Sequence, residues 1–118
     1  MEYKRADRVS DLLREEIARM LLREVKDPRI GFVTITDVEV SDDLRSAKVF
    51  FSMVGSEMEL EKAMKGLNSA SRFIKRKLGK RLRMRYIPDI VFKFDRSLEY
   101  GSHINGILKE LKGSASDE

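Results

Sequence analysis

The apolar residues of this chain switch between two spacings, and the order of the switches limits the fold. They recur every three or four residues from about Ala6 to Lys26 and again from Leu60 to Leu82. This spacing predicts two amphipathic helical segments. Asp27-Pro28 is expected to end the first of them, because the residue before proline is pushed out of the helical region.

Alternating apolar residues between and after these segments predict three strands. Phe32–Val40 and Ala47–Met53 flank the polar SDDL of residues 41–44, which indicates an antiparallel hairpin. The apolar phase shifts inside the first of these strands, so a bulge is expected near residue 36 or 37. Ile90, Phe92 and Phe94 alternate in a third strand that begins just after a proline.

The second helical segment has a clear start and an interruption. SEME at residues 56–59 fits a capping box, in which the serine and the glutamate each satisfy a free N–H of the first turn. NSAS at residues 68–71 places four small residues in the middle of the segment, and the asparagine and two serines among them are poor helix formers. We therefore expect two helices that meet at a kink.

Together these elements predict an α+β fold with the order α-β-β-α-(kink)-α-β and a three-stranded sheet packed on helices. Ile104, Ile107, Leu108 and Leu111 suggest a short C-terminal helix. A chain of 118 residues is about one domain. Residues 1–112 are expected to form it, and residues 113–118, GSASDE, to be a disordered tail.

Several kinds of chemistry find no support in the sequence. Without cysteine there is no disulfide framework, thiolate zinc site or cysteine nucleophile. The single histidine, His103, has no nucleophile motif near it, and the glycines form no phosphate-binding loop. No catalytic, metal-binding or cofactor-binding residue is predicted. The charged N-terminus and the lack of a long apolar run favour a cytoplasmic protein that does not enter membranes.

The charges are strongly segregated along the chain. Lys62 to Pro88 contains ten basic residues and no acid, a formal charge of +10, whereas the other 14 basic and 20 acidic residues give −6. A split of this size inside one small domain points to a polyanionic partner, nucleic acid first and an anionic membrane surface second.

A helical wheel separates this segment into two sides. Ala70, Phe73, Ile74, Leu78 and Leu82 share one side, and the opposite side is cationic. If this side of the helix were only solvated, acids would be expected between the cations. Binding to an anionic membrane surface is less favoured, because the apolar side of the helix is needed for the core. Gly79 is expected to end the helix as its C-cap, or else to allow a phosphate backbone to approach. The predicted RNA-binding residues are Arg72, Lys75, Arg76, Lys77, Lys80, Arg81, Arg83 and Arg85.

The order of elements resembles a type II KH domain, an RNA-binding module, although the usual GXXG is absent. In its place stands NSASRF. Together with DPRIGFVTITDVEVSDDLRSAKVFFS at residues 27–52 and PDIVFKFDRSLEYG at residues 88–101, it is similar to the ribosome-binding factor A family. The resemblance runs from about Arg8 to Ile104. The family marks its kink with Ala-x-Gly, and the chain matches it at Ala70 and Ser71 but has Arg72 in place of the glycine.

The resemblance implies a non-catalytic bacterial factor, expected here as a monomer. Its partner would be the small (30S) ribosomal subunit, with its 16S rRNA and neighbouring ribosomal proteins. Its role would be late rRNA maturation, particularly 5′-end processing, and growth after cold shock. From the residues alone, a small nuclease and a general nucleic-acid-binding protein remain open alternatives.

Overall fold

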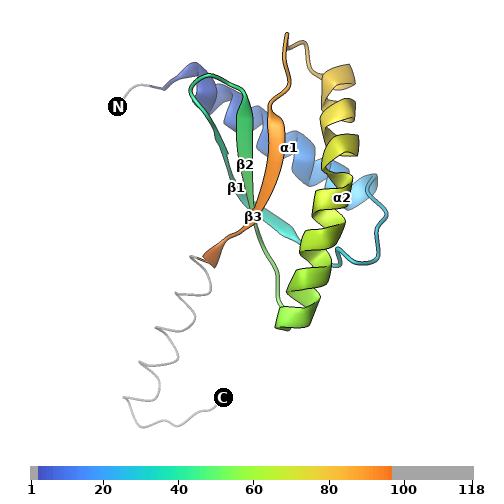
Figure 1. Ribbon diagram of the computed structural model, residues 1–118. Helices are drawn as coiled ribbons and strands as arrows, with labels where there is room; N and C mark the ends of the chain where they lie inside the picture. Colours follow the sequence, from blue (N-terminus) through green and yellow to red (C-terminus); the bar gives the residue numbers. More distant parts are fainter. Residues whose placement is uncertain (1–2, 97–118) are drawn as a thin grey trace, which may run out of the picture.

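The computed structural model describes residues 3–96 and has the predicted α+β architecture (Figure 1). Helix α1, Arg5–Arg23, precedes strands β1, Thr34–Val40, and β2, Ser46–Ser52. Helix α2, Glu57–Arg81, then leads to strand β3, Asp89–Phe94. The predicted C-terminal helix, His103 and the tail from residue 113 lie outside the described residues.

The three strands form one mixed sheet in the order β1-β2-β3. β1 and β2 are antiparallel, as the hairpin prediction required, whereas β3 runs parallel to β2. The register of the hairpin shifts between Ile35 and Asp37, which confirms the predicted bulge. Pro88 precedes the first residue of β3, so its missing N–H removes no hydrogen bond from the sheet.

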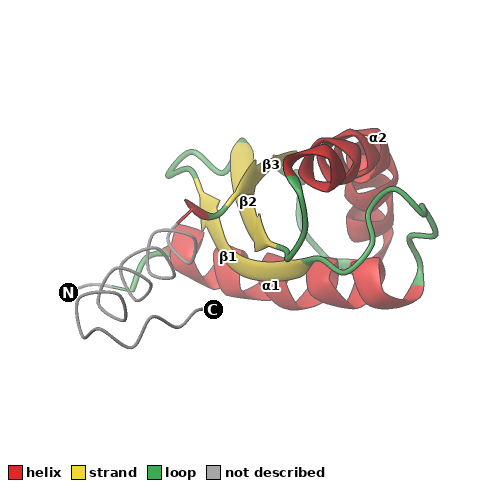
Figure 2. Ribbon diagram, turned by 90° about the horizontal axis from the view of Figure 1, so that it is seen from below, coloured by secondary structure: helices red, strands yellow, loops and turns green. Residues whose placement is uncertain are grey.

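Both helices cover the same face of the sheet. In β2 only Ala47, Val49 and Phe51 are buried, so the alternate residues face away from the helices. Figure 2 shows α1 running along β1 and α2 lying beside β3. The core between these layers contains most of the predicted apolar residues of both helices, although Leu12 is exposed. Those fully buried are Leu13, Ile17, Met20, Leu67, Ile74 and Leu78.

Helix α1 ends earlier than the sequence predicts. Its last residue is Arg23, and the N–H of Glu24 closes the final turn by donating to the carbonyl of Met20 at 2.8 Å. Asp27, expected to mark the helix end, instead accepts hydrogen bonds from the backbone and guanidinium of Arg29. The chain thus turns before the proline and carries Ile30 into the core.

Helix α2 begins at the predicted capping box. The Ser56 hydroxyl accepts from the Glu59 N–H, and the Glu59 carboxylate accepts from the Ser56 N–H at 2.9 Å. These hydrogen bonds, the backbone one first, lower the pKa of Glu59. The Glu59 carboxylate therefore stays ionised at the positive end of the helix dipole.

The predicted division of this segment into two helices is wrong. α2 is one continuous helix through residues 68–71, and its axis changes direction near the middle (Figure 1). Leu67, Ala70 and Ile74 keep one side of the helix buried across this region. The Ser71 hydroxyl donates to the Asn68 carbonyl at 2.8 Å, an arrangement that bends helices without breaking them.

The predicted C-cap at Gly79 is also wrong. α2 continues to Arg81, and the N–H of Leu82 donates to the Leu78 carbonyl at 2.8 Å. Leu82 packs against the core one turn beyond the fully buried Leu78, which holds the last turn in place. The helix therefore presents its cations over two more residues.

Candidate nucleic-acid interface

The eight predicted RNA-binding residues follow one another along the second half of α2 and the connection after it, a segment called the basic face here. Six of them belong to the second half of α2, and Arg83 and Arg85 follow in the connection to β3. Lys75 and Lys77 are half-buried and the other members are exposed. The buried stripe of Ala70, Ile74 and Leu78 fixes the opposite side of the helix to the sheet, and so determines the direction of this face.

At least four cations of the basic face are available to an external anion. In the described part of the chain, the side chains of Arg72, Arg76, Lys80 and Arg83 lie within ion-pair distance of no carboxylate. Arg76 and Lys77 stack near the Phe73 ring, at 5.9 and 5.6 Å from its centroid. Both cations therefore lie near one aromatic ring of the same helix.

Arg81 is held within the protein instead. Its guanidinium donates to both carboxylate oxygens of Glu24 and lies 3.9 Å from Glu16 on α1. The hydrogen bond from Arg81 lowers the pKa of Glu24, and the same bond raises the pKa of Arg81. Arg81 therefore links the end of α2 to the end of α1. Its partner Glu24 could not be identified from the local sequence.

Lys75 is likewise paired. Its Nζ lies 2.5 Å from the Asp89 carboxylate at the start of β3. Residues 62–88 contain no acid, but two of their cations form ion pairs with acids from other parts of the chain. Two of the eight predicted residues contribute to tertiary structure, and the charge available to a partner is concentrated in the remaining ones.

The kink residues behave as parts of a helix. Ala70 is buried and Ser71 is half-buried. Leu44 is the one residue other than glycine with a positive φ in the described chain, so Arg72 has an ordinary backbone conformation. The arginine at this position imposes no backbone strain, and its side chain extends the basic face toward the middle of α2.

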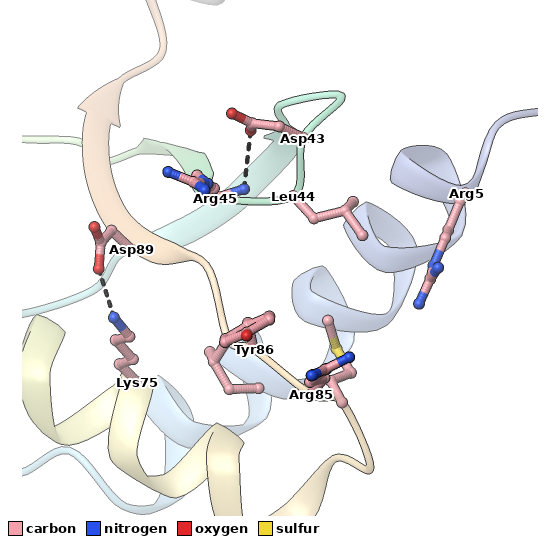
Figure 3. A pocket seen from close by; sticks show the side chains of 10 residues that line it. Arg5, Asp43, Leu44, Arg45, Lys75, Arg85, Tyr86 and Asp89 are labelled. Carbon is pink, nitrogen blue, oxygen red and sulfur yellow. Dashed lines mark hydrogen bonds and ion pairs between the residues drawn. The ribbon is translucent and has the colours of Figure 1, made fainter.

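A cavity of about 630 Å³ lies beside the basic face (Figure 3). Its wall combines the start of α1, the hairpin turn, α2 and the connection to β3. Sequence reasoning missed its cations Arg5 and Arg45 and its exposed aromatic residue Tyr86, because they come from three distant segments. The residues that line it are Arg5, Asp43, Leu44, Arg45, Lys75, Met84, Arg85, Tyr86, Ile87 and Asp89.

Residues 3–96 contain no group of three or more His, Asp or Glu side chains placed to hold a metal ion. No helix in this range is long and apolar enough to cross a membrane.

Comparison with known proteins agrees with this description. The family model described as "Ribosome-binding factor A" matches residues 5–108. The chain is 57% identical to ribosome-binding factor A of Syntrophobacter fumaroxidans, over 94% of this chain and 97% of that protein.

Solved structures show the same fold. The crystal structure of ribosome-binding factor A from Thermus thermophilus matches with a TM-score of 0.68 and 26% identity, over 80% of this chain and all of that one. A homology model of the Thermus thermophilus factor, fitted into a cryo-EM map of a 30S complex, matches with a TM-score of 0.62 and 28% identity. It covers 74% of this chain and 91% of that one. The chain belongs to the ribosome-binding factor A family.

Proposed function

We propose that this chain binds the small ribosomal subunit through its basic face and assists late maturation of 16S rRNA, including processing of its 5′ end. The observation that carries this proposal is the set of exposed cations without an ion pair, Arg72, Arg76 and Lys80 on α2 and Arg83 just after it, on a helix fixed to the sheet by its buried side. The similarity to a factor fitted into a 30S complex supports the choice of partner. We propose that the protein acts in the cytoplasm as a monomer and that it supports growth after cold shock.

The proposed role is to hold an rRNA conformation rather than to cut RNA. Cations on a helix contact phosphates without reading bases, so this face supplies affinity and orientation. Phe73, the one aromatic residue of α2, packs against the core, and Phe92 is buried, so no platform of stacked aromatic residues lies on the basic face. We infer a non-catalytic factor, because the family to which the chain belongs is described as a ribosome-binding factor.

Binding to isolated small subunits is expected to weaken steeply with salt. Each phosphate neutralised contributes about 0.7–0.9 to the slope of log K against log salt, so four contacts predict a slope of about −3. A fourfold rise in monovalent salt should then reduce affinity about 60-fold. The measurement is a binding titration at several salt concentrations and constant magnesium, which keeps the subunit intact. A slope near zero would show that phosphates are not the main contact.

A further inference from the structure

The cavity beside the basic face has the size of a binding site for a small group. Its volume of about 630 Å³ lies within the range of about 300–1,000 Å³ found for ligand pockets. Lys75 and Arg85 belong both to its wall and to the basic face. A polyanion held on that face therefore passes the mouth of the cavity.

The lining offers a surface for a flat, apolar ring. Leu44, Met84 and Ile87 are half-buried and pack against the core. Tyr86 is 72% exposed although it is large and aromatic. The Arg85 guanidinium lies 5.7 Å from the centroid of the Tyr86 ring, which places a cation beside this aromatic surface.

The charges of the cavity favour an anion. Its two acids already have donors: Asp89 accepts from Lys75, and Asp43 accepts from the Ser41 hydroxyl and the Arg45 N–H. The Ser41 hydrogen bond, followed by the Arg45 N–H, lowers the pKa of Asp43, so this carboxylate stays ionised and engaged with the turn.

The arginines of the cavity are not tied up in ion pairs, although the charge of Arg45 also helps to lower the pKa of Asp43. Within residues 3–96, the guanidinium groups of Arg5, Arg45 and Arg85 form no ion pair with a carboxylate. Guanidinium is well suited to phosphate, because its planar donors match two phosphate oxygens at once. Unpaired guanidinium groups and an exposed aromatic ring thus surround one apolar hollow.

We propose that this cavity holds one unpaired RNA nucleotide. The base packs on Tyr86 over Leu44 and Met84, and the adjoining phosphate lies between Arg5 and Arg85, which Figure 3 shows on the same side of the cavity. The nucleotide is unpaired because the faces of a base in a duplex are covered by its neighbours, whereas a single strand leaves them open for stacking. This inference rests on the proposed function, and it adds a site for single-stranded rRNA to the phosphate contacts of the basic face.

A fluorescence experiment tests the site directly. The chain contains no tryptophan, so Tyr86→Trp introduces one reporter into the cavity. A short single-stranded RNA of mixed sequence should quench its fluorescence through stacking, and the same strand annealed to its complement should quench it much less. Phe32→Trp is the control, because Phe32 is 98% exposed before β1, at the end of the sheet away from the hairpin turn. Unchanged fluorescence of the Tyr86→Trp variant at RNA concentrations that saturate binding would refute the site.

Affinity measurements on a matched pair of variants separate this inference from the proposed function. Tyr86→Ala should weaken binding to the single strand about 5- to 100-fold, whereas Tyr86→Phe, which keeps the ring, should bind like the native chain. If Tyr86→Ala binds the strand normally while the native chain still binds small subunits, the nucleotide site is wrong and the proposed function stands. Loss of subunit binding without loss of strand binding would assign the cavity to a protein contact and would also overturn the inference.

Discussion

Replacement of Arg76 and Arg83 by glutamate together is expected to weaken binding to the small subunit about 100-fold or more. Both side chains are exposed and lie near no carboxylate in the described chain, so each is free to contact a phosphate. Reversal removes two charge-assisted contacts, worth about 1.5–3 kcal/mol each, and adds repulsion. The melting temperature should change little, because neither side chain contributes to the core.

A control with the same change in net charge is available on α1. Arg8 and Arg14 are exposed, lie outside the basic face and form no ion pair with another described residue. Arg8→Glu with Arg14→Glu should leave subunit binding within a few-fold of the native value. Equal losses in both double variants would mean that net charge alone drives the interaction. Intact binding by the Arg76 and Arg83 variant would show that the basic face is not the interface.

Leu78→Ala is expected to have the opposite effect, a large loss of stability. Leu78 is fully buried between α2 and the sheet, and truncation leaves a cavity that costs about 2–5 kcal/mol. For a domain of this size the melting temperature should fall by about 10–25 °C. Thermal unfolding followed by circular dichroism measures this change. Leu22→Ala makes the same truncation at a helix residue that is 81% exposed and should change stability little. A normal melting temperature for Leu78→Ala would mean that the helix is not fixed to the sheet by its apolar stripe.

Patterns set by neighbouring residues could be predicted from the sequence. The bulge in β1 follows from a phase shift of apolar residues, and the capping box follows from Ser56 and Glu59 three positions apart. The order of helices and strands likewise follows from spacing alone. In each case the interaction that decides the structure lies within a few residues of the pattern.

Predictions that depended on weak local preferences were wrong. Poor helix formers at residues 68–71 suggested a break, and Gly79 suggested a helix end. The buried residues Leu67, Ala70, Ile74 and Leu78 hold the helix together through both positions. Tertiary packing of an apolar stripe outweighs propensity differences, which are about 1 kcal/mol or less per residue.

The composition of the basic face could be predicted, but its internal pairing could not. Helical spacing placed Arg76 and Lys80 on the outer side. It did not show that Arg81 meets Glu24, because these residues are 57 positions apart. The cavity around Tyr86 was missed for the same reason, since its walls come together only when the hairpin turn, α1 and α2 have packed.

Directed cleavage of rRNA from a single tethering site tests the central claim, that the basic face lies against the small subunit. The chain has no cysteine, so one can be added to carry an iron chelate that cleaves nearby RNA. Asn68→Cys places the chelate on the exposed side of α2, one turn before Arg72, without removing a cation. Glu39→Cys places it on the sheet face away from the helices. Strong, localised cleavage of 16S rRNA from residue 68 and weak cleavage from residue 39 is the predicted result. Strong cleavage from residue 39 and none from residue 68 would contradict the account.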